Sequence, residues 1–465
     1  MYPCQSPMVS LFVAAAIVAA VSPLHAQVAP ERKTTETLLA PFPRELRDSA
    51  IISPDGRRIA YVQAAGDKVT AVIDGKPETA YDRVLELTFS PDSRWHAYAA
   101  ELGQQWQIVI NGRAQPAHAR VGPPLFSPDS QRLAYVALQP NNEHVAVVEV
   151  PPKGTAPVYE RVLEGRLYFS PDSRRLAFAA RRDGKWHVVV DGKELGPYDF
   201  VGTATGIHFS EDGSRVAFAA LVNDKWHVVL DGSLQPAYEN IGDVAFSPNG
   251  KRFAYAAERD DGWRVVLDGN EHKAYEEIAE GKLRFSPDGA TLAYAARSGG
   301  KWLVVAGGEE GRPRDGIGQM LFSPDSKLLA YIAEVAGAEM VVLNNRDQRV
   351  FDHVGHGSLA FSPDSRRLGY VARVGRASFV VVDGKRNPRY DMVGYLSFTP
   401  DSRSYVYAAT AEGKVFTVVD EQPSATRWDS IWTVPEAKLL FDPKRRQFYY
   451  LAVRDESIYL VVEEL

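Results

Sequence analysis

Two histidines occupy the same place in consecutive copies of a sequence repeat, and each follows a tryptophan. His187 and His227 could share one zinc ion, because the neutral imidazole of histidine is a common zinc ligand. A zinc site needs at least three protein ligands, and no third ligand recurs beside this pair. The pattern favours a packing or surface role for both histidines, and we predict no metal site and no cofactor.

Nucleophilic catalysis has few candidate residues in this sequence. The only cysteine, Cys4, precedes the long apolar run near the N-terminus, so the mature chain would hold no thiol. The Gly-x-Ser-x-Gly turn that presents the serine of α/β hydrolases does not occur. We therefore expect a protein that is not an enzyme, and we assign no catalytic residue.

Tryptophan side chains recur at one register, and indole rings of this kind can stack on sugars. Their fixed register in successive repeats instead favours packing between neighbouring repeats. A carbohydrate-binding or envelope-binding module stays open as an alternative. The residues are Trp106, Trp186, Trp226, Trp263 and Trp302.

The aspartates of the repeat turns could be considered calcium ligands. Calcium takes six or more oxygen atoms, usually from alternating acidic positions in one loop. Each turn offers one aspartate, and basic residues often follow it, as Arg174 and Arg175 follow Asp172. We therefore assign these aspartates to turn geometry.

One internal repeat positions all of these residues. The string Phe-Ser-Pro-Asp-Ser/Gly, or a close variant, recurs at intervals of 37 to 43 residues. A period near 39 suits one blade of a β-propeller, which has four strands. The sequence therefore predicts an all-β fold: a β-propeller of about eleven four-stranded blades, in one large ring or in two smaller rings. The serine, or its substitute, stands at positions 53, 90, 127, 170, 210, 247, 286, 323, 362, 399 and 442.

A single copy illustrates the four expected strands, named A to D. We expect strand A to end at Phe169, strand B to cover 175–180 and strand C to cover 185–190. The Ser-Pro-Asp-Ser turn joins A to B, because proline presets φ and aspartate bonds the local backbone. Asp191 and Gly192 form a hairpin turn after strand C. We place strand D around 198–201.

Two columns of the repeat predict how the blades pack. Eight residues after the serine position there is always an aromatic residue, from Tyr61 to Tyr450, and a small residue such as Ala177 precedes it in nine copies. Neighbours in a strand point to opposite faces of a sheet, so each blade offers bulk on one face and a recess on the other. We expect the aromatic ring of one blade to enter the recess of the next.

The position just before the phenylalanine varies between copies, whereas the positions around it are regular. Strand A is innermost in a propeller, so residues at this position would face the central channel or its mouth. Tyr168, His208 and Arg284 are our candidate ligand-binding residues on this basis.

Arginines also recur just after the A–B turn and would line one rim. We expect them to pair with nearby turn aspartates rather than to form a site for an anionic ligand. They are Arg58, Arg132, Arg175, Arg215, Arg252 and Arg367.

The motif resembles that of a known family. The stretch 361–370, Phe-Ser-Pro-Asp-Ser-Arg-Arg-Leu-Gly-Tyr, is similar to the WD40-like PD40 repeat. That repeat occurs in the TolB-type periplasmic propeller and in the propeller domains of tricorn-type and prolyl-oligopeptidase-type proteases. The resemblance covers nearly all of residues 51–465 and implies the propeller fold, without the hydrolase domain of the proteases. It carries no functional residue, because the motif consists of turn and core positions.

The N-terminus resembles an export signal. Residues 11–21 form an apolar run too short to span a bilayer, and Ala26 suits a cleavage site, although no lysine or arginine precedes the run. We predict a signal peptide at 1–26, an N-terminal segment at 27–50 and the repeat array at 51–465. Because the last repeat stops after its third strand, we expect Lys33 to Asp48 to supply the outer strand. Such closure would remove an exposed sheet edge.

Charge and repeat architecture together suggest a function. The chain has 53 basic and 59 acidic residues, a net charge of −6, which argues against a nucleic-acid partner. We predict a periplasmic or secreted scaffold, without a transmembrane span in the mature chain, that binds a protein or peptide. The alternatives are a lyase or hydrolase with its site at the channel mouth, and the carbohydrate-binding or envelope-binding module.

Overall fold

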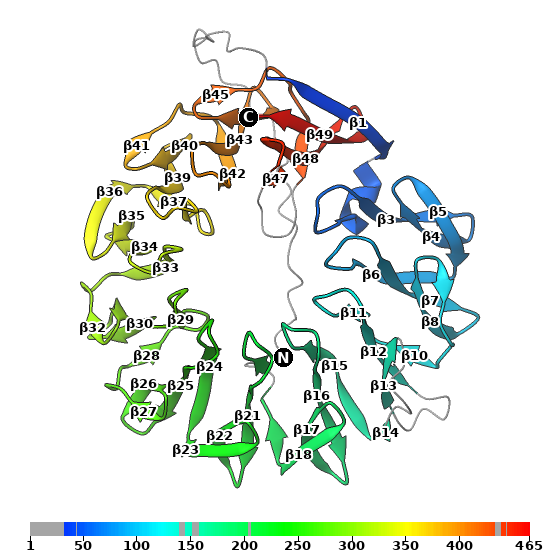
Figure 1. The fold of residues 1–465 in the computed structure, drawn as a ribbon, viewed down its shortest axis with the longest axis vertical. Coiled ribbons are helices and arrows are strands. Elements are labelled where there is room, and N and C mark those ends of the chain that lie inside the picture. The colour runs from blue at the N-terminus through cyan, green and yellow to red at the C-terminus, as the bar shows by residue number, and fades with distance from the viewer. Residues whose placement is uncertain are drawn as a thin grey trace. The chain divides into compact units, whose positions relative to one another are not determined.

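The computed structural model describes residues 32–42, 44–138, 145–150, 158–202, 206–432, 439–442 and 444–465. The predicted signal peptide lies outside the described residues. Apart from one short 3-10 helix, η1 (Arg44–Ser49), the regular elements of the described residues are β-strands. These strands form eleven antiparallel sheets, which are the eleven four-stranded blades of a β-propeller (Figure 1). The predicted fold class is confirmed.

The blades are numbered here in chain order, and each pairs its strands in the order A-B-C-D, with strand A sometimes divided in two. Blade 1 contains β2 (Ile51–Ile52), β3 (Ile59–Ala65), β4 (Lys68–Ile73) and β5 (Lys76–Tyr81). Blade 2 contains β6 (Arg83–Phe89), β7 (His96–Leu102), β8 (Gln105–Ile110) and β9 (Arg113–Ala114). Blade 3 contains β10 (Arg120–Val121), β11 (Leu125–Phe126), β12 (Leu133–Leu138), β13 (Val145–Val150) and β14 (Val158–Tyr159). Blade 4 contains β15 (Arg161–Phe169), β16 (Leu176–Arg182), β17 (Lys185–Val190) and β18 (Lys193–Tyr198).

The next four blades follow the same plan. Blade 5 contains β19 (Phe200–Val201), β20 (Ile207–Phe209), β21 (Val216–Val222), β22 (Lys225–Leu230) and β23 (Ser233–Tyr238). Blade 6 contains β24 (Asn240–Phe246), β25 (Phe253–Arg259), β26 (Gly262–Leu267) and β27 (Asn270–Glu271). Blade 7 contains β28 (Glu277–Ile278), β29 (Arg284–Phe285), β30 (Leu292–Ser298), β31 (Lys301–Ala306) and β32 (Glu309–Glu310). Blade 8 contains β33 (Gly316–Phe322), β34 (Leu329–Val335), β35 (Ala338–Leu343) and β36 (Arg346–Phe351).

The last three blades include the two chain ends. Blade 9 contains β37 (His353–Val354), β38 (Ala360–Phe361), β39 (Leu368–Val374), β40 (Ala377–Val382) and β41 (Lys385–Arg386). Blade 10 contains β42 (Met392–Phe398), β43 (Tyr405–Ala411), β44 (Lys414–Val419) and β45 (Gln422–Pro423). Blade 11 contains β46 (Ser430–Trp432), β47 (Leu440–Asp442), β48 (Gln447–Arg454), β49 (Ser457–Glu464) and β1 (Thr34–Pro41).

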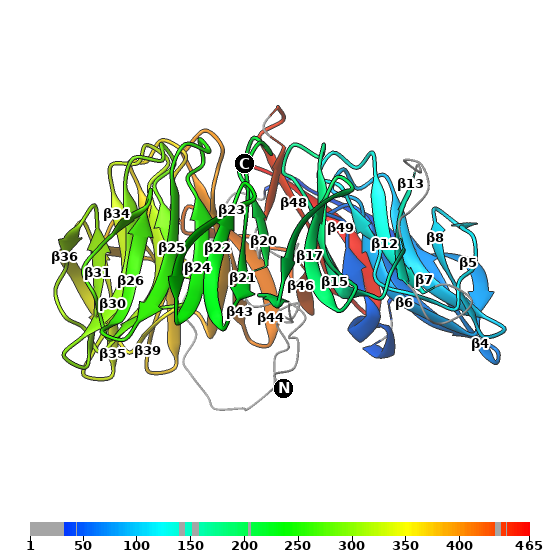
Figure 2. The ribbon, with the colours of Figure 1, turned by 90° about the horizontal axis from the view of Figure 1, so that it is seen from below.

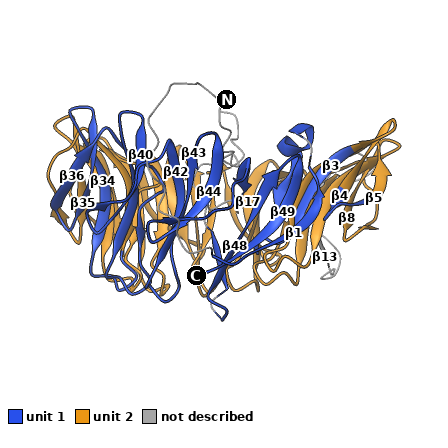
Figure 3. Cartoon of the chain, turned by 90° about the horizontal axis from the view of Figure 1, so that it is seen from above, with its two compact units in different colours: residues 1–63, 72–77, 323–465 blue, residues 64–71, 78–322 orange. Residues whose placement is uncertain are grey.

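The chain divides into two compact units, shown in two colours in Figure 3. Unit 1 comprises residues 1–63, 72–77 and 323–465, and unit 2 comprises residues 64–71 and 78–322. Within unit 2, neighbouring blades pack against each other, as β22 of blade 5 does with β24 of blade 6 (Figure 2). No helix among the described residues is long and apolar enough to cross a membrane.

Strand D begins earlier than the sequence predicted. In blade 4 it is β18, Lys193–Tyr198, and Phe200–Val201 already belongs to the first strand of blade 5. The reason is the two-residue turn at Asp191 and Gly192, both at positive φ, which lets the chain pair with β17 at once. Placing strand D around 198–201 was therefore wrong.

The Ser-Pro-Asp turn is a small network of hydrogen bonds. In blade 4 the buried Ser170 hydroxyl donates to the Asp172 carboxylate at 2.5 Å and accepts the Arg175 N–H at 3.0 Å. The fourth turn residue, Ser173, lies at φ 63°, and its hydroxyl accepts the N–H of Asp129 from blade 3 at 2.8 Å. The motif therefore builds the turn, and where its fourth residue is Ser130, Ser173, Ser365 or Ser402 it also ties the turn to the preceding blade.

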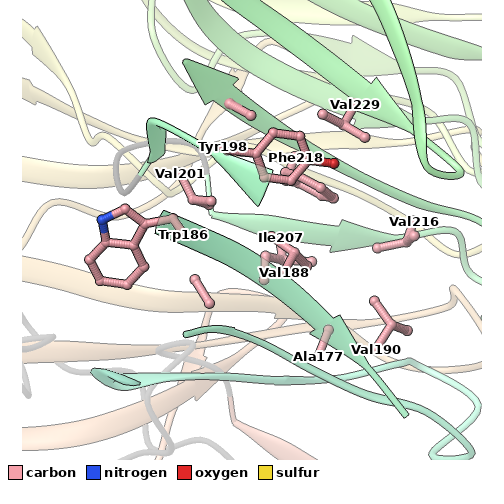
Figure 4. Close-up of a cluster of buried hydrophobic side chains, with 12 residues drawn as sticks. Ala177, Trp186, Val188, Val190, Tyr198, Val201, Ile207, Val216, Phe218 and Val229 are labelled. Carbon is pink, nitrogen blue, oxygen red and sulfur yellow. The ribbon is translucent and has the colours of Figure 1, made fainter. Parts of the chain in front are cut away.

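Aromatic side chains fill the space between blades, as predicted, but each ring packs with the alanines of the preceding blade rather than with those of the next. Figure 4 shows one such cluster, in which Phe218 of blade 5 packs with Ala177 and Ala179 of blade 4. The same cluster contains Tyr198, the last residue of strand D, whose ring meets Phe218 edge-on at 5.7 Å. This second aromatic column at the end of strand D was not foreseen. It recurs in the edge-on or tilted pairs Tyr81–Tyr98, Tyr159–Phe178, Tyr238–Tyr255, Tyr275–Tyr294, Phe351–Tyr370 and Tyr390–Tyr407.

The N-terminal strand completes the last blade. In unit 1, β1 pairs antiparallel with β49, from Thr34 opposite Glu463 to Pro41 opposite Ser457. Arg32 anchors this pairing: its Nε donates to the fully buried Glu463 carboxylate at 3.1 Å. Beyond β1, Phe42 is fully buried in a cluster that joins Trp432 of blade 11 with residues of blade 1. The segment 33–48 thus contains the outer strand of blade 11.

Candidate functional site

The two ends of the blades differ in how many of their polar side chains form hydrogen bonds or ion pairs within the protein. We call the end with the Ser-Pro-Asp turns the A–B side, and the end with loops such as Asp183–Gly184 and Gly299–Gly300 the B–C side. On the A–B side, Arg175 pairs with Asp191 at 3.1 Å, and its Nη1 donates to the carbonyls of Gly213 and Ser214 in the next blade. The predicted pairing of these arginines with turn aspartates is confirmed for five of them. The pairs are Arg58–Asp74, Arg175–Asp191, Arg215–Asp231, Arg252–Asp268 and Arg367–Asp383.

The B–C side carries a second repeated bond. The acidic residue that follows strand D accepts a salt bridge from the lysine that begins strand C of its own blade. Lys185 and Asp199 are 2.6 Å apart, and the other Asp199 oxygen accepts the Asn223 N–H of the next blade. These bonds lower the pKa of Asp199, with the bond from Lys185 as the largest cause. Equivalent salt bridges join Lys68–Asp82, Lys225–Glu239, Lys301–Asp315 and Lys414–Asp429.

Blade 6 lacks this salt bridge, because glycine replaces the lysine at the start of its strand C, as alanine does in blades 8 and 9. Gly262 lies at φ 119°, and a Cβ there would approach the Tyr275 carbonyl oxygen to 2.4 Å. That carbonyl accepts the N–H of Trp263, so the close approach belongs to the strand pairing itself. Glu276, which follows strand D of blade 6, therefore has no lysine beside it.

A cleft of about 550 Å³ opens at this place, between blades 6 and 7 on the B–C side. Indole rings from strand C of both blades line it, together with carboxylates from blade 6 and from the entry to blade 7. The lining residues are Gly242, Asp243, Ala256, Trp263, Glu276, Glu277, Ile278, Ala279, Glu280 and Trp302.

A glycine positions one indole of the cleft. A Cβ on Gly242 would lie 3.1 Å from the Trp263 ring, so the ring rests against the bare backbone of β24. Gly202 seats Trp226 in the same way in blade 5. Both of these contacts lie within one blade. The expected inter-blade packing is seen instead in the clusters that Trp226 and Trp263 share with buried residues of the following blade. Trp263 and Trp302 stay partly exposed where they line the cleft.

Two of the four carboxylates are held by backbone. Asp243 accepts the Lys282 N–H at 3.1 Å, where the inner strand of blade 7 is interrupted between β28 and β29. Glu276 accepts the Gly299 N–H at 2.6 Å. Both acids thereby satisfy N–H groups that would otherwise lack partners.

The remaining carboxylates are less constrained. Arg297 approaches Glu276 at 3.9 Å and Glu277 at 3.6 Å, and all three side chains are roughly half exposed. Glu280 is exposed and makes no ion pair with the described residues. The other nearby cation, Lys282, donates to the Gly318 carbonyl, and burial lowers its pKa. The cleft therefore keeps an excess of negative charge.

The three candidates from the inner strands do not form one site in the structure. His208 lies in β20 and lines a smaller cleft of about 320 Å³ between blades 5 and 6, with Phe209, Glu211 and Phe246. Tyr168 is half-buried in β15, and its hydroxyl is 2.9 Å from where a Cβ on Gly206 would be.

Arg284 in β29 is exposed, and its Nη1 donates to the Leu283 carbonyl at 3.0 Å. A ligand role for Tyr168, His208 and Arg284 stays a prediction.

The two histidines differ in their hydrogen bonding. His227 Nδ1 is 2.8 Å from the Gln235 carbonyl, whereas His187 Nδ1 is buried without a partner among the described residues. The described residues contain no group of three or more metal-binding side chains.

Sequence reasoning missed the cleft, although it had a visible signal. Lys185, Lys225 and Lys301 precede the tryptophan of strand C, and Gly262 breaks that series. The sequence does not show that the acidic residue after strand D is the partner of this lysine, because the two lie 14 residues apart.

Neither a family model nor a curated protein sequence matches this chain. Solved structures that resemble it include a eukaryotic initiation factor, with 15% identity over 75% of this chain and 96% of that chain, at a TM-score of 0.41. TolB from Acinetobacter baumannii has 13% identity over 62% and 77% of the two chains, at a TM-score of 0.26. The Dos1 propeller has 13% identity over 73% and 92%, at a TM-score of 0.32. With similarity this low, no function is taken from these three proteins.

Proposed function

We propose that this chain is an exported, non-catalytic propeller scaffold that binds a protein or peptide partner in the cell envelope, in the manner of TolB-type proteins. The observation that carries the proposal is the contrast between the two sides of the blades. Arginines of the A–B side are used in bonds within and between blades, and the cleft at His208 on that side measures about 320 Å³. The cleft on the B–C side measures about 550 Å³ and has two indole rings and four carboxylates in its walls. Aromatic side chains in a water-accessible cleft are common anchors of protein interfaces.

Export rests on the N-terminal apolar run of residues 11–21 and the small residue at Ala26. The TolB-like setting rests on the resemblance of the repeat motif to PD40. The proposal of a scaffold rather than an enzyme rests on the missing nucleophile motif, since Gly-x-Ser-x-Gly does not occur in the sequence.

Photo-crosslinking in the native host tests this function. A benzoylphenylalanine replaces Phe200, which is 36% exposed on the B–C side next to Trp226. The matched control replaces Trp95, which is 44% exposed in the A–B turn of blade 2. We expect one envelope polypeptide to be captured from position 200 and not from position 95.

Equal capture from both positions, or none from position 200, would contradict the proposal. An envelope-extract activity that depends on the added chain and is lost in His208→Ala and Arg284→Ala would favour the enzyme alternative.

A further inference from the structure

We propose that the cleft between blades 6 and 7 binds a lysine or arginine side chain of a polypeptide partner. This inference rests on the proposed function, because it names the chemistry that the partner presents at one place on the B–C side. Two independent features of the cleft favour a cationic side chain as its ligand. These are the indole side chains in its walls and its negative charge.

The walls contain two indole side chains. Trp263 and Trp302 come from strand C of adjacent blades and both line the cleft. The face of an indole ring attracts a cation within about 6 Å of its centre, by about 0.5–2 kcal/mol depending on desolvation. The seat at Gly242 fixes Trp263, so little rotamer entropy is lost on binding.

The charge of the cleft comes from a missing internal cation. In blades 4 and 5, Lys185 and Lys225 occupy the position beside the acid that follows strand D. At Gly262 the backbone leaves no space for a side chain, yet Glu276 is retained and Glu277 and Glu280 are added on the same wall. A lysine from a partner would supply the positive charge that Lys185 and Lys225 supply in blades 4 and 5.

The equivalent cleft between blades 9 and 10 shows that this chemistry is local. It is lined by His353, Arg373, Arg376 and Asp391, and Ser378 stands where Trp263 stands in blade 6. With basic side chains and no indole, that cleft is unsuited to a cation.

The test uses the full chain labelled with fluorotryptophan, which has eight tryptophans and therefore few signals. Trp263→Phe and Trp302→Phe assign the two resonances of the cleft. The probes are acetylated Gly-Lys-Gly, Gly-norleucine-Gly, which has the same four-carbon chain without the ammonium group, Gly-Glu-Gly and free spermidine. We expect only the lysine peptide to shift both resonances saturably, and to do so less as ionic strength rises from about 0.05 M to about 0.3 M.

Variants of the carboxylates separate the cleft from general surface charge. The double change Glu277→Gln with Glu280→Gln should weaken binding of the lysine peptide by about threefold or more, since each removes one nearby negative charge. Glu309→Gln removes the same charge from exposed strand β32 of the same blade, outside the cleft, and should leave binding unchanged.

Three outcomes would overturn the inference. These are no shift at Trp263 and Trp302, an equal shift with the norleucine peptide, or equal loss of binding in Glu309→Gln. If spermidine binds as tightly as the lysine peptide, the ligand class is a free polyamine, and the polypeptide assignment falls.

The crosslinking and peptide-binding experiments together distinguish failure of this inference from failure of the proposed function. Capture of a partner at position 200 without peptide binding in the cleft would remove only this inference. Peptide binding without any captured partner would instead remove the scaffold function.

Discussion

At the scale of single residues, the aromatic column shows how one hydroxyl group changes what a buried aromatic side chain contributes to stability. Tyr98 and Tyr135 are both fully buried at the same position of blades 2 and 3. The Tyr98 hydroxyl donates to Glu78 at 2.9 Å, whereas the Tyr135 hydroxyl has no hydrogen-bond partner among the described residues. Burial raises the pKa of Tyr135 to about 12 and raises that of Tyr98 further, with Glu78 as an added cause.

Replacing each tyrosine by phenylalanine should therefore have opposite effects. Tyr135→Phe removes an unpaired buried hydroxyl and should raise the free energy of unfolding by about 1 kcal/mol. Tyr98→Phe leaves part of the Glu78 carboxylate without its donor and should lower it by about 1–3 kcal/mol. Denaturant unfolding of both variants measures the difference, and two changes of the same sign would contradict this account.

The sequence predicted this column, but it did not predict which hydroxyls are satisfied. The spacing of eight residues from the turn serine identifies the aromatic, and native Phe178 and Phe218 show that the ring suffices. The partner of Tyr98 is Glu78 on the outer strand of the preceding blade, 20 residues away, and nothing local points to it. Hydrogen bonds between blades depend on how neighbouring blades are rotated relative to each other. The spacing of the sequence repeat does not encode that rotation.

At the scale of elements, the Ser-Pro-Asp turns stabilise the folded chain by an amount that depends on pH. The turn serine or threonine hydroxyl is the largest cause that lowers the pKa of the turn aspartate, and for Asp212 this gives a pKa of about 2. The same cause acts on Asp129, Asp172, Asp325, Asp364 and Asp401. Since the folded pKa lies below the unfolded value of 3.8, acid protonates the unfolded chain first.

The contribution of these turns should be complete above about pH 5 and should be lost as the pH falls towards 2. Asp212→Asn should lower the denaturant midpoint at pH 7, and its difference from the wild type should shrink at pH 3. Asparagine fits the turn, because Asn249 accepts the Ser247 hydroxyl in blade 6. Glu309→Gln is the control, and a difference for Asp212→Asn that is constant with pH would contradict the prediction.

The elements themselves were largely predictable, with one systematic error. Strand C of blade 4 was predicted at 185–190 and is β17, Lys185–Val190. Strand D was placed too late because Tyr198 and Val201 both resemble buried strand residues, and both are buried. They belong to different blades, and only the chain crossing at Asp199 separates them.

At the scale of the whole molecule, the chain ends depend on each other. Deleting residues 27–48 should sharply lower the melting temperature, because it removes β1 and leaves the edge of β49 unpaired. Arg32→Met should cause part of this loss by leaving Glu463 buried without its cation. Lys33→Met is the matched control, since its salt bridge to Glu464 is exposed. An unchanged melting curve after the deletion would exclude a stabilising role for β1.

The pairing of β1 with β49 has a consequence for how the protein is made. β1 is made long before its partner β49, so blade 11 stays incomplete until β49 has been synthesised. A chain that lacks β49 keeps the edge of β48 open, and other strands can join it. We therefore expect chains that lack β49 to be recognised as incompletely folded and degraded.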